Sequence, residues 1–159
     1  MADNDIFALA EEKGHAFWIC TGRGIDRLCQ RTDRVRRYQE DKGLSNSTFQ
    51  TICVDRSGRV WAGCRSGLYL YRPQTDDFIR VAWEADKDKA IPITMVFEDS
   101  TGKFWLGTSD DGAYVCNQQM QVIRHYEKEN KDSGVIGNDI TCIYEDYFKN
   151  VWIGYNQYG

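Results

Sequence analysis

Residues 52–71 read ICVDRSGRVWAGCRSGLYLY, and this stretch decides the fold. Its start, Ile52 to Val54, is an apolar run that predicts a buried strand. The step from Asp55 to Gly58 predicts a tight turn, because an aspartate carboxylate accepts backbone N–H groups two residues on and glycine adopts positive φ. A strand carrying Trp61 follows, and Gly67 opens another. The stretch therefore predicts three short strands joined by tight turns.

The same pattern occurs four times along the chain. Its tryptophans are separated by 43, 44 and 47 residues, and an acid stands six residues before each one. A glycine stands two residues after three of them, and Cys20 replaces it in the first unit. The tryptophans are Trp18, Trp61, Trp105 and Trp152; the acids are Glu12, Asp55, Asp99 and Asp146; the glycines are Gly63, Gly107 and Gly154. Repetition at this many positions identifies a repeat protein.

A fourth, more polar strand completes the repeat at residues 78–82 and 122–126. Nothing of ten residues or more has a helical period. Four short strands in about 45 residues are typical of a β-propeller blade. We expect the repeated tryptophans, acids and glycines to pack neighbouring blades together and not to form a catalytic site. The sequence therefore predicts an all-β fold of four-stranded antiparallel propeller blades.

The blades are expected at approximately residues 5–40, 48–83, 92–127 and 139–159, within a single partial domain covering 1–159. The last blade is truncated, so the chain contains about three and a half blades. Closed propellers have about four to eight blades, and an incomplete ring leaves apolar blade faces open. We therefore expect further blades in a longer protein, or self-association through the exposed faces.

Composition narrows the class of function. The chain has 159 residues with 20 basic and 24 acidic side chains, a formal charge of −4, and no basic stripe suited to nucleic acid. The arginine-rich run at 31–37 is interpreted as a solvated outer strand. No apolar run approaches the ~20 residues of a membrane span, and the N-terminus lacks the features of a secretory signal. A soluble fragment without nucleic-acid partners is expected.

Six cysteines and two histidines offer little chemistry by their spacing. There is no CxxC pair, and His15 and His125 stand alone in sequence, so no metal site and no cofactor are predicted. Small buried thiols are the favoured interpretation. The number of cysteines favours a reducing compartment such as the cytoplasm. Whether these thiols are free, or pairs such as Cys20 and Cys64 are oxidised, stays open.

The segment from Leu44 to Tyr71 resembles the two-component regulator propeller repeat, whose consensus contains D-x-x-G-x-x-W-x-G-T followed by G-L-x-x-Y. The first unit departs from it at Cys20, and the fourth has Asp146-Tyr147-Phe148-Lys149 in place of D-x-x-G. The resemblance implies a periplasmic sensor region of a hybrid histidine kinase of gut Bacteroidetes that recognises carbohydrate. The kinase would lie elsewhere in the protein, and this fragment is expected not to be an enzyme.

Ligands usually approach a propeller at the loops between second and third strands and at the blade connectors. These loops are expected at 21–23, 65–66, 109–111 and 156–158, with connectors at 41–47, 86–90 and 129–138. Charged and amide side chains there suit sugar hydroxyls and carboxylates. The candidate ligand-binding residues are Arg23, Arg65, Asp110, Asp111 and Asn156. A protein-interaction scaffold is the first alternative function and a propeller lyase the second; no catalytic residue is predicted.

Overall fold

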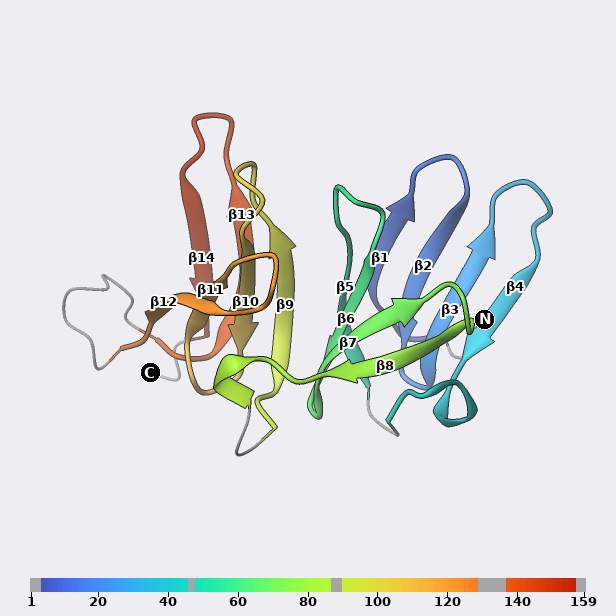
Figure 1. Ribbon diagram of the computed structural model, residues 1–159, viewed down its shortest axis with the longest axis horizontal. Coiled ribbons are helices and arrows are strands. Elements are labelled where there is room, and N and C mark those ends of the chain that lie inside the picture. Colours follow the sequence, from blue (N-terminus) through green and yellow to red (C-terminus); the bar gives the residue numbers. More distant parts are fainter. Residues whose placement is uncertain (1–3, 46–47, 87–89, 129–136, 157–159) are drawn as a thin grey trace.

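The computed structural model describes residues 4–45, 48–86, 90–128 and 137–156. Successive strands pair antiparallel in four sheets that follow one another along the chain (Figure 1). The first sheet contains β1 (Ile6–Glu12), β2 (Ala16–Thr21), β3 (Gly24–Cys29) and β4 (Val35–Tyr38). The second contains β5 (Phe49–Val54), β6 (Val60–Cys64), β7 (Gly67–Arg72) and β8 (Asp77–Val81). Residues 35–37 of the arginine-rich run lie on β4, the outer strand of the first sheet, and residues 31–34 form the connection before it.

The third sheet contains β9 (Ile93–Glu98), β10 (Phe104–Thr108), β11 (Ala113–Cys116) and β12 (Val122–Tyr126). The fourth sheet has two described strands, β13 (Ile140–Glu145) and β14 (Val151–Tyr155). Short 3-10 turns at Glu40–Lys42 and Glu84–Asp86 are the helical segments of the described residues. The prediction of an all-β fold of propeller blades in an incomplete ring is confirmed, because the sheets of the described residues do not close a ring.

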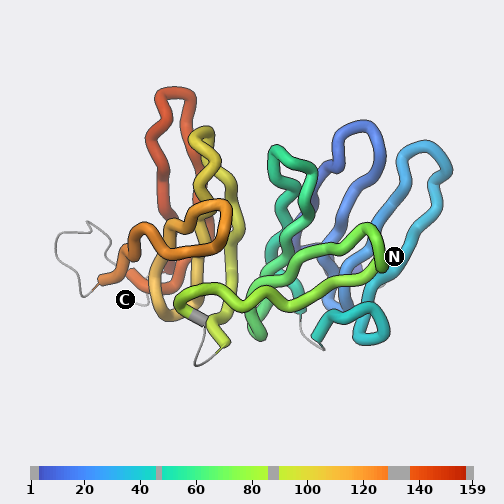
Figure 2. The backbone as a smooth tube through the Cα atoms, viewed as in Figure 1, coloured from blue at the N-terminus to red at the C-terminus, as the bar shows by residue number. Residues whose placement is uncertain are grey.

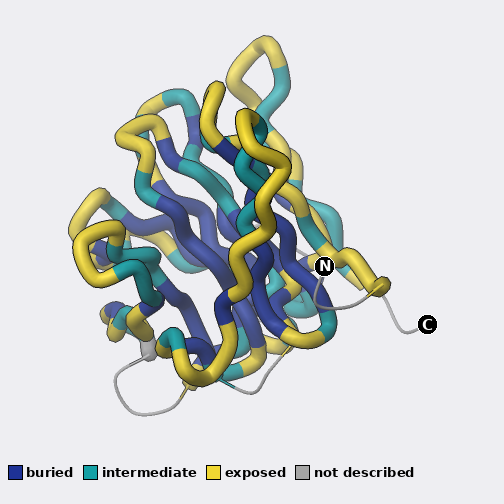
Figure 3. The backbone as a smooth tube through the Cα atoms, turned by 90° about the vertical axis from the view of Figure 1, so that its right-hand side faces the viewer, coloured by how far each residue is buried: buried dark blue, intermediate teal, exposed yellow. Residues whose placement is uncertain are grey.

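First strands of successive sheets lie beside one another, with contacts between β1 and β5, β5 and β9, and β9 and β13. The backbone trace shows the sheets stacked as layers around this inner row (Figure 2). Three apolar clusters fill the spaces between adjacent sheets, one for each pair. Buried backbone runs through the middle of the stack and exposed segments lie at its margins (Figure 3). The core is therefore a series of interfaces between sheets.

The acid and the tryptophan of each repeat form a hydrogen bond inside one hairpin. The Trp61 Nε1–H group donates to Asp55 Oδ2 at 2.9 Å, and Trp105 donates to Asp99 at 2.9 Å. The other Asp55 oxygen accepts the Ser57 N–H at 2.9 Å, which is the turn geometry that the sequence predicts. Each carboxylate therefore fixes both its turn and its tryptophan.

In the second, third and fourth hairpins, the turn position three residues after the acid has a left-handed backbone. Gly58 has φ of 80° and Gly102 has φ of 81°. Lys149 occupies this position in the fourth hairpin with φ of 70°. The departure from D-x-x-G thus preserves the turn, at the steric cost that a side chain has in this conformation.

The tryptophans differ in how far neighbouring sheets cover them. Trp18, Trp61 and Trp105 are 0, 3 and 9% exposed, because each packs in the space before the next sheet. Trp152 is 63% exposed, although it donates the same hydrogen bond to Asp146 at 2.9 Å. Within the described residues no sheet covers the Trp152 side of the stack. Open apolar faces at the ends are therefore present, as the sequence predicts.

Candidate functional site

A cavity of about 650 Å³ opens where the β2–β3 turn meets the connector between the first and second sheets. The turn is short because Gly24 begins β3 directly after Arg23. The connector contains the 3-10 turn Glu40–Lys42, which ends at Gly43 with φ of 81° and a bond from its N–H to the Glu40 carbonyl. The cavity is lined by Gly22, Arg23, Gly24, Gln39, Glu40, Asp41 and Ser45.

Hydrogen bonds join the two walls of this cavity. Gln39 Nε2 donates to the Arg23 carbonyl at 2.9 Å, so the connector is tied to the turn. The Thr21 hydroxyl accepts the Arg23 N–H at 3.3 Å and donates to the Gly24 carbonyl at 3.1 Å. Ser45 Oγ lies 2.6 Å from Ser66 Oγ, which brings the β6–β7 turn of the second sheet to the cavity margin. The pocket is thus held by backbone and side-chain bonds from two sheets.

Charges of both signs surround the opening. The Arg23 side chain is exposed on one wall, and the Glu40 and Asp41 side chains are exposed on the other. A guanidinium donates paired hydrogen bonds, and carboxylates accept them, so the lining can bind neighbouring hydroxyls or an anionic group. The arrangement is chemically suited to binding a polar ligand.

Arg23 is the one predicted ligand residue that lines this cavity. Arg65 is exposed on the β6–β7 turn beside Ser66. Asp110 is exposed and Asp111 half-buried on the β10–β11 turn, where Asp111 accepts the Tyr114 hydroxyl at 2.7 Å. Asn156 bonds Asp139 through its amide at 3.1 Å. The structure therefore places the five candidates at corresponding ends of successive sheets, with one at the cavity.

Several candidate segments fall outside the described residues. These are the part of the last loop at 157–158 and the parts of the connectors at 46–47, 87–89 and 129–136. Gln39 and Glu40 are not among the predicted candidates, because the sequence places the end of the first blade at residue 40 and the connector after it. Their signal would have been the glycine at 43, which marks the end of a helical turn.

Asp111, His125 and Glu127 have ligand atoms that all lie within 4.8 Å of one another. His125 is on β12, where its Nε2 lies 2.6 Å from the Asp111 carbonyl and its ring stacks on Tyr114 at 3.9 Å. Two carboxylates and an imidazole could hold a divalent cation. Sequence spacing did not reveal this group, because the pairing of β11 with β12 brings together residues that are 14 or more positions apart.

A second cavity of about 460 Å³ lies among the hairpins of the first three sheets. Glu12, His15, Cys53 and Glu98 are among the residues that line it. Burial raises the pKa of the Cys53 thiol to about 11, so the thiol stays protonated near neutral pH. This cavity therefore lacks an activated nucleophile at Cys53.

All six cysteines are free thiols in the structure. The two buried ones in the first apolar cluster, Cys20 and Cys64, are not bonded to each other. Burial raises the pKa of Cys20, and the Cys20 Sγ lies 3.6 Å from the Thr51 carbonyl of the next sheet. The residue that interrupts the glycine pattern thus makes a contact between sheets.

Comparison with known proteins identifies the repeat. The model of the two component regulator propeller family matches residues 43–66 and 134–157. These two segments are similar to the two-component regulator propeller repeat. Histidine kinase P4 of Formosa agariphila is 25% identical over 166 residues, which include 98% of this chain. The chain spans 12% of the length of that relative.

Solved structures share the architecture of this chain. The extracellular domain of a hybrid two component system from B. thetaiotaomicron superposes with a TM-score of 0.76 at 22% identity, covering 94% of this chain and 22% of the other. Virginiamycin B lyase from Staphylococcus aureus superposes with a TM-score of 0.70 at 10% identity, covering 93% of this chain and 48% of the lyase. At these identities the likeness establishes the propeller fold alone. In the described residues no helix is long and apolar enough to cross a membrane.

Proposed function

We propose that this chain is part of the ligand-sensing propeller of a two-component sensor and binds an oligosaccharide outside the inner membrane. The observation that carries the proposal is the polar cavity at Arg23, Gln39 and Asp41, in a chain whose residues 43–66 and 134–157 match the two component regulator propeller model. The similarity to an extracellular domain of a hybrid two component system supports the periplasmic location. The histidine kinase of such a sensor would lie outside this chain.

The chemistry of the cavity favours a carbohydrate with an anionic group. Arg23 can form paired bonds with a carboxylate, while Glu40 and Asp41 can accept hydrogen bonds from vicinal hydroxyls. A volume of about 650 Å³ is in the range of small-ligand pockets. The ligand would be bound and not transformed, as expected for a sensory module.

Isothermal titration calorimetry against a panel of neutral and acidic oligosaccharides tests this function. We expect saturable binding of at least one acidic oligosaccharide, with Arg23→Ala lowering affinity about tenfold or more through loss of a charge-assisted bond. Arg34→Ala is the matched control, because Arg34 is exposed on the β3–β4 turn and does not line the cavity. The affinity of Arg34→Ala for the same oligosaccharide should equal that of the unchanged protein.

No saturable binding across the panel would overturn the carbohydrate proposal. Equal loss of affinity in Arg23→Ala and Arg34→Ala would overturn the assignment of the cavity. A thermal unfolding curve for each variant distinguishes lost binding from lost folding.

A further inference from the structure

The repeat tryptophan occupies a corresponding place in the three internal interfaces. In each, it shares an apolar cluster with the residue that precedes the tryptophan of the next sheet. Trp61 and Phe104 have ring centroids 5.2 Å apart across the second interface. Trp18 and Val60 belong to the first apolar cluster, and Trp105 and Val151 to the third. Each interface is therefore directional, with different residues on its two sides.

A glycine and an isoleucine form a second contact, which the second and third interfaces have in common. A Cβ atom added to Gly63 would lie 2.6 Å from Ile93 Cγ2 of the next sheet. A Cβ atom added to Gly107 would lie 2.7 Å from Ile140 Cγ2. Such separations are far below ordinary van der Waals contact. The glycine two residues after the tryptophan therefore makes room for an isoleucine of the following sheet.

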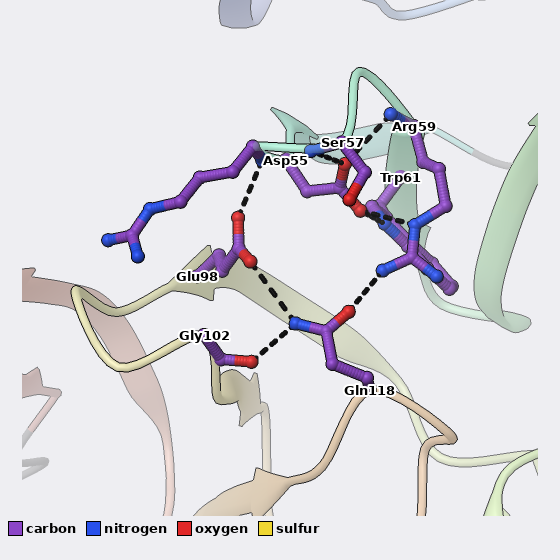
Figure 4. Close-up of polar contacts among 8 residues, drawn as sticks. Asp55, Ser57, Arg59, Trp61, Glu98, Gly102 and Gln118 are labelled. Atoms are coloured by element: carbon purple, nitrogen blue, oxygen red, sulfur yellow. Dashed lines mark hydrogen bonds and ion pairs between the residues drawn. The ribbon is translucent and has the colours of Figure 1, made fainter.

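The second and third interfaces also share a hydrogen bond between adjacent hairpins. Glu98, the last residue of β9, accepts the Arg56 N–H at 2.7 Å, and Gln118 bridges Glu98 to Arg59 of the preceding sheet (Figure 4). Glu145, at the end of β13, accepts the Ser100 N–H at 2.8 Å. In both cases the donor follows the repeat aspartate, and the acceptor precedes the aspartate of the next sheet.

The open side of the fourth sheet carries the first half of all three contacts. Trp152 is 63% exposed and Tyr144, its cross-strand partner, is 64% exposed. Gly154 stands two residues after the tryptophan, and the Tyr147 N–H follows the repeat aspartate. These groups correspond to Trp61, Gly63 and the Arg56 N–H of the second sheet.

The open side of the first sheet carries the second half. Phe17 precedes Trp18 and is half-buried, and Leu9, opposite Ile19 on the same side, is 61% exposed. Ile6 occupies the position of Ile93 and is 53% exposed. Glu11 precedes the repeat acid, as Glu98 and Glu145 do. The two ends of one chain therefore present the two complementary sides of its own internal interfaces.

We infer that the open side of the fourth sheet docks on the open side of the first sheet of a second copy of this chain. In the docked pair Trp152 packs on Phe17, Ile6 enters the space at Gly154, and Glu11 accepts the Tyr147 N–H. The contact is heterologous, so two copies related by a two-fold axis form it twice and close a ring.

A second copy is favoured over an unrelated partner because one chain supplies every element of the interface. An unrelated partner would have to provide an aromatic ring, an isoleucine and a carboxylate at the spacing of this repeat. The exposed aromatic residues at the fourth sheet also fit the composition of protein interfaces. The inference is independent of the proposed ligand.

Size-exclusion chromatography with light scattering, across a wide range of protein concentration, tests the docking with two variants. Trp152→Glu disables the open side of the fourth sheet, and Leu9→Glu disables that of the first. The unchanged chain should reach twice the monomer mass. The association constant of each variant alone should be lower than that of the unchanged chain by about 30-fold or more, as expected for loss of an interface anchor. An equimolar mixture should form a heterodimer through one intact contact, because each variant retains the side that the other lacks; it should associate more tightly than either variant alone and more weakly than the unchanged chain.

Recovery in the mixture distinguishes head-to-tail docking from contact between two like sides. The proposal is overturned if Leu9→Glu alone dimerises as the unchanged chain does. It is also overturned if the unchanged chain is a monomer at every concentration. Ile123→Glu is the matched control, because Ile123 is 53% exposed on the outer strand β12. It should associate normally, and near-UV circular dichroism should show a native signal for all variants.

Discussion

The hairpins of the third and fourth sheets contain the same acid–tryptophan hydrogen bond in different surroundings. Trp105 and Trp152 each donate to their aspartate at 2.9 Å, yet one ring is 9% exposed and the other 63%. The hydrogen bond is therefore a local property of the hairpin, whereas burial depends on the neighbouring sheet. One repeat therefore specifies the hydrogen bond between its acid and its tryptophan, and the next sheet of the stack buries the tryptophan ring.

Replacing the two tryptophans should give the largest difference. Trp105→Ala removes a buried ring between sheets and should lower the free energy of unfolding by roughly 3–5 kcal/mol. Trp152→Ala removes an exposed ring and should cost about 1 kcal/mol or less. Urea unfolding at a concentration where the chain is monomeric measures both. Equal losses would show that the hairpin bond, and not the neighbouring sheet, dominates.

The left-handed turn position offers a reciprocal exchange between the same two hairpins. Gly102→Lys should destabilise the protein by about 1–2 kcal/mol, because a side chain is unfavourable at positive φ. Lys149→Gly should stabilise it by about 0.5–1 kcal/mol, since it relieves that cost. Thermal unfolding of both variants and of the double variant provides the check. A stability loss in Lys149→Gly would contradict the explanation.

Lowering the pH should reduce the stabilising contribution of the buried Asp99 carboxylate more than that of the exposed Asp146 carboxylate. Burial opposes ionisation of Asp99, but hydrogen bonds from Thr101, Trp105 and Lys103 outweigh it and lower the pKa. A lowered folded-state pKa contributes stability that is present above the unfolded pKa of about 3.9 and is lost as pH falls through the folded value.

Asp99→Asn should consequently lose less stability than the unchanged protein between about pH 5 and pH 2. Asp146 also has a lowered pKa, owing first to its bond from Trp152, but water screens this exposed site. Asp146→Asn should change the pH dependence less. Urea midpoints at several acidic pH values measure both slopes, and identical slopes in all three proteins would rule out this account.

Thiol labelling should show the same contrast without a change in stability. Cys20 lies under the second sheet, and burial raises its pKa, whereas Cys142 is exposed on the open fourth sheet. Cys29 has a pKa lowered by its hydrogen bond with Thr32. A thiol reagent with mass-spectrometric mapping should modify Cys29 and Cys142 first and Cys20 last. Early labelling of Cys20 would indicate that the first interface opens.

The sequence was sufficient for features that one repeat encodes. The strand order, the turn after Asp55 and the burial of Trp61 and Trp105 follow from local patterning and period. The bond from Arg59 to Gln118 joins residues 59 positions apart, and nothing in the repeat pattern indicates it. The cavity at Arg23 likewise depends on how a connector folds back on a turn. These two contacts needed the structure, because they depend on side chains at positions where the repeats differ.

The two-stranded fourth sheet has a consequence for the dynamics of the stack. Repeat arrays are stabilised by nearest-neighbour coupling, so an end unit with one covered side opens more easily than an inner unit with two. Backbone amides of β14 should exchange with solvent fastest among the strands, and those of β5 and β6 slowest. Local unfolding would thus begin at the C-terminal hairpin and proceed inward one sheet at a time.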